Sequence, residues 1–97
     1  MTRYDVNITR KALKELNKLD PHSRNRILEV LTILRDYGFT SRLDIKKLRG
    51  YKSHYRIRVG KYRILFELEK PRKIIVYAIL PKHISNGKPH SCISYDM

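Results

Sequence analysis

Apolar and polar residues alternate near the start of the chain, and their spacing changes within ten residues. Tyr4, Val6 and Ile8 are separated by polar residues, and this period of two predicts a half-buried strand. Between residues 12 and 19 the apolar side chains recur three and four positions apart. That spacing predicts a short first helix.

A second helix is indicated by its own start and stop signals. Asp20 offers an oxygen acceptor for the unpaired amides of a first turn, and Pro21 lacks an amide hydrogen that would have no partner there. Apolar residues at helical spacing continue to about Tyr37, and Gly38 is a typical helix end. We therefore expect a helical hairpin.

The most regular alternation runs from residue 54 to residue 68 and is interrupted once, by Gly60 and Lys61. Two alternating segments joined by a two-residue loop that begins with glycine predict a tight β-hairpin. In that register three pairs share the buried side of the sheet, namely Val59 with Tyr62, Ile57 with Ile64, and Tyr55 with Phe66.

Two further segments complete the expected sheet. Residues 45–48 could form a short strand, and residues 73–80 are apolar at nearly every position, as in a strand covered on both faces. We summarise the order as β-α-α-β-β-β, which predicts an α+β fold with an antiparallel sheet and the helical hairpin packed on one face. One domain should span residues 1–84, and residues 85–97 should form a C-terminal tail.

The composition indicates an anionic partner. Lys and Arg number 22 against 9 Asp and Glu, which gives a formal net charge of +13. Such self-repulsion is relieved by a polyanion or an acidic protein, so RNA, DNA, the ribosome and an acidic inhibitor are the candidates. The longest apolar run, Ile74 to Leu80, is too short to span a membrane. A polar N-terminus and a single cysteine, Cys92, favour the cytoplasm.

The hairpin register also predicts a basic surface opposite the buried pairs. Arg58 should lie opposite Arg63, Arg56 opposite Leu65, and His54 opposite Glu67, on a solvent-facing side of the sheet. Like charges placed opposite one another destabilise a sheet by up to about 1 kcal/mol, so a ligand should offset this cost. Guanidinium groups bind phosphate through paired hydrogen bonds and stay charged. The alternative is a solvated basic face without a specific ligand.

Other basic residues could extend this surface. The candidate RNA-binding residues, which would follow a nucleic-acid backbone without reading its sequence, are Lys46, Lys47, Lys52, Lys61 and His54. Each of these lysines could equally be an ordinary surface residue. His83 follows Pro81 by two residues and should lie at the rim of the sheet, where it could transfer protons near neutral pH.

We expect neither a metal nor a cofactor. His83, His90 and Cys92 lack the paired short spacings of zinc sites and a fourth ligand. The acidic residues do not cluster as a two-metal nuclease requires. Any chemistry would be carried by bases and arginines.

The element order, the segment KKLRGYKSHYRIRVGKYRILFEL from Lys46 to Leu68, and the apolar strand after it together resemble the RelE/ParE toxin superfamily. The resemblance covers roughly residues 3–84. RelE-type members of that superfamily enter the ribosomal A site and cut mRNA, ParE-type members poison DNA gyrase, and an antitoxin holds each inactive. The resemblance implies a type II toxin, a ribosome-dependent mRNA endoribonuclease, with an acidic RelB-like antitoxin as its partner.

Residue by residue, the resemblance implies that Arg56, Arg58, Arg63 and His83 are catalytic. The ribose 2′ oxygen would attack the adjacent phosphate, leaving a 2′,3′-cyclic phosphate and a 5′ hydroxyl, while arginines stabilise the phosphorane. The general base stays unassigned, because arginine is a poor proton acceptor and no tyrosine follows His83 until Tyr95. Two alternatives remain open, a ParE-type gyrase inhibitor of the same fold and a non-toxic nucleic-acid-binding module.

Overall fold

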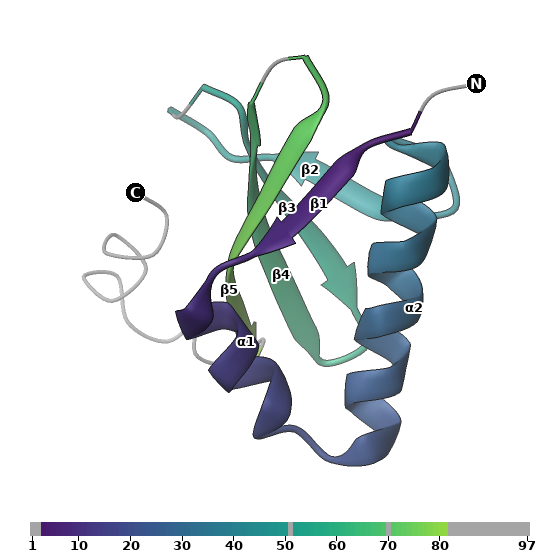
Figure 1. The fold of residues 1–97 in the computed structure, drawn as a ribbon, viewed down its shortest axis with the longest axis vertical. Helices are drawn as coiled ribbons and strands as arrows, with labels where there is room; N and C mark the ends of the chain where they lie inside the picture. The colour runs from purple at the N-terminus through teal and green to yellow at the C-terminus, as the bar shows by residue number, and fades with distance from the viewer. Residues whose placement is uncertain (1–2, 51, 70, 82–97) are drawn as a thin grey trace.

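The computed structural model describes residues 3–50, 52–69 and 71–81, and these form two helices and a five-stranded sheet (Figure 1). The boundaries of both helices and of the β-hairpin match the sequence prediction closely. In chain order the elements are β1 (Asp5–Ile8), α1 (Arg10–Asn17), α2 (Pro21–Tyr37), β2 (Asp44–Lys47), β3 (His54–Val59), β4 (Tyr62–Glu69) and β5 (Lys73–Pro81).

The strand order in the sheet is β1-β5-β4-β3-β2. The expected α+β class is confirmed, and two details differ from the expected order. Residues 44–47 do form a strand, so four strands follow the helices. In addition, β1 pairs with β5 in parallel, whereas all other neighbours are antiparallel, so the sheet is mixed. No turn joins β1 to β5, and turn signals are what reveal strand direction in a sequence.

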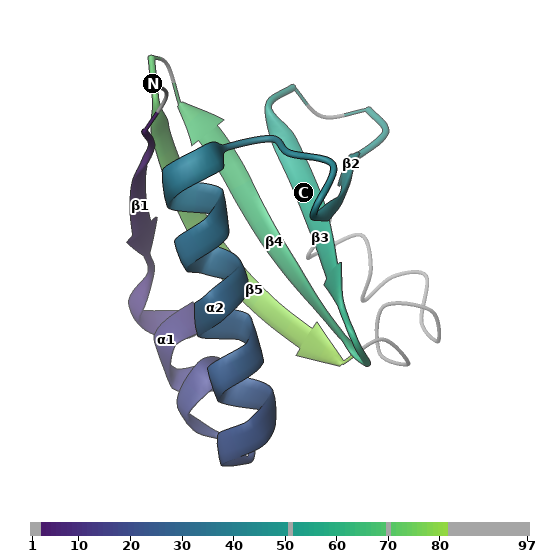
Figure 2. The same ribbon diagram turned by 90° about the vertical axis from the view of Figure 1, so that its right-hand side faces the viewer.

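Both helices cover the same face of the sheet (Figure 2). Between the helices and the sheet lies the main hydrophobic core, whose buried members come from α1, α2 and the inward positions of β3, β4 and β5. They include Ala12, Leu16, Ile27, Leu31, Leu34, Ile57, Val59, Ile64, Phe66, Ile74, Val76 and Ile79. Neither helix in the described part of the chain is long and apolar enough to cross a membrane.

The helix ends confirm the predicted signals. Asp20 caps α2, and its carboxylate accepts a hydrogen bond from the Ser23 amide at 3.1 Å. At the other end, the Gly38 amide donates to the Leu34 carbonyl at 2.8 Å. Gly38 has φ 71° and ψ −139°, a conformation that is almost restricted to glycine.

A β-bulge interrupts the pairing of β4 with β5. Leu65 pairs with Ala78 but the next residue, Phe66, pairs with Val76, so Tyr77 is the extra residue of the bulge. Val76 belongs to the main core, whereas Tyr77 and Ala78 belong to a second apolar cluster on the other face of the sheet. This cluster explains why β5 is apolar along both of its faces.

The Glu15 side chain of α1 completes the hydrogen bonding of β5. Strand β1 pairs with β5 only as far as Val76. Beyond it, the backbone amide of the buried residue Ile79 donates to the Glu15 carboxylate at 2.9 Å. An otherwise unsatisfied buried amide would cost about 1–3 kcal/mol, so this contact fixes α1 against the sheet.

Replacing Gly38 tests the helix end. A Cβ atom at Gly38 would collide with the Tyr4 ring, whereas a Cβ at Gly50, which also has a positive φ, meets open space. Gly38→Ala should therefore lower the free energy of unfolding by about 3 kcal/mol, the sum of backbone strain and overpacking. Gly50→Ala should cost about 1 kcal/mol. Urea denaturation measures both, and equal losses would show that the Tyr4 contact is unimportant.

Candidate anion-binding site on the distal face of the sheet

The predicted register of the β3–β4 hairpin is confirmed at every pair. Ile57 and Ile64 are fully buried beneath the helices. The alternate residues point to the other side of the sheet, which we call the distal face because it is turned away from α1 and α2. Its cross-strand pairs are Arg58 with Arg63, Arg56 with Leu65, and His54 with Glu67.

Arg56 differs from the prediction, because it is not exposed to solvent. Only 8% of its surface is accessible, and it is the one buried charged residue in the described part of the chain. Its cross-strand partner Leu65 belongs to the second apolar cluster, which also contains Ala78 and Leu80. This cluster makes the middle of the distal face apolar, so the sequence alternation correctly predicted the side on which Arg56 lies but not its burial.

The charge of Arg56 has little compensation from protein groups. Within residues 3–50, 52–69 and 71–81, no hydrogen bond or ion pair of its guanidinium is observed. Burial lowers the pKa of Arg56, the nearby charges of Arg58 and Arg63 lower it further, and Asp44 opposes them. Arginine nevertheless stays protonated at neutral pH. A bound anion would relieve both the desolvation and the repulsion.

Arg58 has one carboxylate neighbour. Its Nε atom lies 3.7 Å from Oδ2 of Asp44, and the two side chains are 45% and 57% exposed. An exposed ion pair of this kind contributes about 0–1 kcal/mol, which is small enough for a phosphate to displace it. The half-buried Arg63 lies directly opposite Arg58. Three guanidinium groups therefore share one part of the distal face, as the sequence predicted.

A histidine and a tyrosine lie beside these arginines. His54 Nδ1 is 3.0 Å from the Tyr77 hydroxyl, and the two rings meet at 69° with their centroids 5.6 Å apart. His54 Nε2 is 3.9 Å from Oε2 of Glu67, the neighbour that the sequence predicted. Tyr77 was missed, because β5 is apolar on both faces and its pattern gives no signal for a functional side chain.

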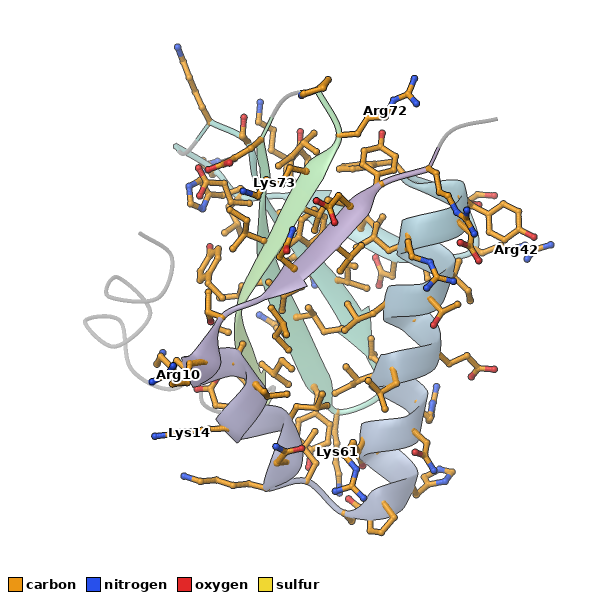
Figure 3. The ribbon with its side chains drawn as sticks, viewed as in Figure 1. Arg10, Lys14, Arg42, Lys61, Arg72 and Lys73 are labelled. Carbon is orange, nitrogen blue, oxygen red and sulfur yellow. The ribbon has the colours of Figure 1, made fainter. Side chains whose placement is uncertain are left out.

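The predicted RNA-binding lysines do not all gather at this site. Lys46 pairs with Arg56 and is exposed on the distal face, whereas Lys47 pairs with Tyr55 and so lies on the helix side. Lys52 is exposed in the loop between β2 and β3. Lys61 lies toward the start of α2 (Figure 3). There it lines a pocket of about 330 Å³ with His22, Ser23 and Arg26.

Some predicted residues lie outside the described part of the chain. These are His83, His90 and Cys92, so the position expected for His83 at the rim of the sheet stays a prediction. Among the described residues, no group of three or more histidine, cysteine, aspartate or glutamate side chains could hold a metal ion.

The geometry suits an oxyanion ligand. The paired strands fix the backbone positions of the three arginines, and a partly buried environment strengthens the attraction of a guanidinium group for a phosphate. The adjacent His54 and Tyr77 offer groups that exchange protons. The distal face therefore offers the positive charges that binding of a phosphodiester would require.

Comparisons with known proteins point to one family. Residues 6–84 match the family described as the ParE toxin of the type II toxin–antitoxin system parDE. The chain is also 40% identical over 58 residues to toxin RelE3 of Methanocaldococcus jannaschii, a match that covers 58% of this chain and 66% of the relative.

Solved structures share the fold. A chain of the RelB–RelE antitoxin–toxin complex from Methanococcus jannaschii superposes with a TM-score of 0.73 at 33% identity, covering 86% of this chain and 99% of the other. A chain of the archaeal RelE–RelB complex from Pyrococcus horikoshii gives the same TM-score of 0.73 at 28% identity, covering 84% and 97%.

The burial of Arg56 gives a test of the anion site. Because Arg56→Met removes a desolvated charge and adds an apolar side chain beside Leu65, it should raise the free energy of unfolding by about 1 kcal/mol. Inorganic phosphate should raise the midpoint of thermal unfolding of the wild-type protein more than that of the variant. Arg72→Met, at an exposed arginine in the β4–β5 turn, controls for the loss of one charge. Equal responses of all three proteins to phosphate would argue against an anion site at Arg56.

Proposed function

Because the chain belongs to the RelE/ParE superfamily of type II toxin–antitoxin toxins, we propose that it is a ribosome-dependent mRNA endoribonuclease that inhibits translation. The observation that carries the proposal is the gathering of Arg56, Arg58 and Arg63 on the distal face. A largely buried arginine whose guanidinium has no protein partner in the described residues suits a site whose ligand is a phosphodiester.

In the proposed reaction the ribose 2′ oxygen attacks the adjacent phosphate. The P–O5′ bond breaks, and the products are a 2′,3′-cyclic phosphate and a 5′ hydroxyl. The three arginines bind the phosphate and stabilise the charge of the phosphorane, which is the role that fixed cations perform best. His83 is the general acid that protonates the leaving 5′ oxygen. No step requires a metal ion.

The lysines differ in their proposed roles according to their distance from the arginine cluster. Lys46 is beside Arg56 and would hold the message next to the cut. Lys47, Lys52 and Lys61 lie further out, where they would contact phosphates of the message or of ribosomal RNA without reading sequence.

An acidic antitoxin is the proposed inhibitory partner. The net charge of +13 favours an acidic chain, and the similar chains from Pyrococcus and Methanococcus were solved in RelE–RelB complexes. We propose a RelB-like protein that is partly disordered when free and folds on binding. The cytoplasm, where ribosomes and such an antitoxin meet, is the proposed location.

Cleavage of message on translating ribosomes tests the function. The full-length protein, incubated with purified translating ribosomes, should create new mRNA 5′ ends within the codon in the A site. Arg58→Ala should slow cleavage about 100-fold, the usual effect of removing one group that stabilises the transition state. Arg58 is suited to this test because it is exposed, so its loss should not disturb the core.

A control variant and two contrary outcomes complete this test. Arg72→Ala removes an exposed arginine far from the distal cluster in sequence and should cleave at the wild-type rate. Blocked DNA supercoiling with intact message would identify a gyrase inhibitor instead. Harmless expression of the full chain without a partner would favour a non-toxic binding module.

A further inference from the structure

The hydrogen bond between His54 and Tyr77 spans the strand that separates them. His54 is in β3 and Tyr77 in β5, with β4 between them. Tyr77 lies on the distal face and packs with the apolar cluster around Leu65, so its side chain extends over β4 toward His54. Its hydroxyl meets His54 Nδ1 at 3.0 Å.

This pair lies next to the arginine cluster. His54 and Arg56 are two residues apart on the same face of β3, a separation of about 6.7 Å along the strand. One nucleotide spans a comparable distance. A phosphate held by Arg56 would thus place a neighbouring ribose within reach of the tyrosine.

Both ring nitrogens of His54 already face a partner. Nδ1 faces the Tyr77 hydroxyl, and Nε2 faces Glu67. If Tyr77 donates to Nδ1, the proton of the neutral ring is on Nε2, beside the Glu67 carboxylate. A phenolic oxygen that donates its own hydrogen keeps lone pairs that can accept another. The phenolic oxygen therefore has the acceptor chemistry that the proton of a ribose hydroxyl requires.

We propose that Tyr77 is the catalytic general base for the ribose 2′ hydroxyl, and that His54 is a positioning residue which takes up the proton of Tyr77. The proposal rests on the endoribonuclease function proposed above, and it supplies the base that the arginines cannot provide.

Two protons move in the proposed reaction before the leaving group is protonated. The 2′ oxygen bonds to phosphorus and gives its proton to the Tyr77 oxygen, while the phenolic proton of Tyr77 passes to His54 Nδ1. The P–O5′ bond breaks, and the 5′ oxygen takes a proton from the general acid. After the products leave, His54 gives its proton to water and the general acid takes one back from water, so both groups are restored and Tyr77 is neutral throughout.

The groups that face His54 define the expected pH dependence. Among the described residues they are Glu67 of β4, Tyr77 of β5 and Arg56 of its own strand, with Lys46 of β2 beside Arg56. His54 must be neutral to accept a proton, so the rate should fall as the pH falls and the ring becomes protonated. The His54 side chain is 21% exposed and that of Glu67 is 39% exposed, so protons can reach the pair.

Single-turnover cleavage on preformed ribosome–message complexes tests the assignment. Tyr77→Phe keeps the packing of the ring and should slow cleavage by about 100-fold or more. His54→Gln should slow it by a similar factor and should remove the acid limb of the pH–rate profile. The double variant should be no slower than either single variant, because the two residues act as one unit. Tyr62→Phe, a half-buried tyrosine on the helix side, should cleave at the wild-type rate.

Two further measurements separate this role from a structural one. The melting temperatures of the variants and their affinity for a message carrying a 2′-methoxy group at the cut site should match those of the wild type. Rate losses that follow lost stability or lost affinity would overturn the assignment. If the wild-type protein cleaved the message and Tyr77→Phe cleaved it at the same rate, only the role of Tyr77 would be overturned. If the wild-type protein left the message intact, the proposed nuclease function would be overturned as well.

Discussion

The register of the β3–β4 hairpin determines most of what this protein can do. Because side chains alternate strictly along a strand, a shift of the pairing register by one residue would turn the apolar side chains of the shifted strand to the other face of the sheet. If β3 shifted in this way, Ile57 would leave the core, and Arg56 and Arg58 would turn toward it. The same hydrophobic burial that stabilises the fold therefore also places the guanidinium groups together on the distal face.

The distal face combines an apolar centre with positively charged side chains, two features that usually conflict. Leu65, Ala78 and Leu80 make its centre apolar, which stabilises the sheet from a second side. Arg56 lies in that setting with two like charges nearby. A cation in such a place has lost part of its hydration before any ligand arrives, so a phosphate that binds it does not have to remove that water again. Burial of Arg56 thus lowers the local stability and at the same time leaves a partly desolvated cation on the distal face.

The sequence was sufficient for features that depend on neighbouring residues. The caps at Asp20 and Gly38 and the pairing of Arg58 with Arg63 follow from local patterns, and the structure has them as predicted. The parallel pairing of β1 with β5 could not be predicted, because it joins segments more than sixty residues apart without a turn between them. The burial of Arg56 was missed for a similar reason, since the apolar residues beside it come from β4 and β5 and a single alternating strand does not reveal them.

The bulge at Tyr77 places two successive residues of β5, Tyr77 and Ala78, on the distal face of the sheet. A regular β5 would continue the alternation that puts Ile75 on one face and Val76 on the other, and residue 77 would follow Ile75 to the distal face while Ala78 followed Val76 into the core. With the extra residue, both Tyr77 and Ala78 belong to the distal side, and Ile79 returns to the core. Tyr77 is then held by apolar packing and by His54 at once. A side chain fixed at both ends loses little further freedom when a ligand binds, and this is the physical requirement for a group that must meet a reacting atom in one orientation.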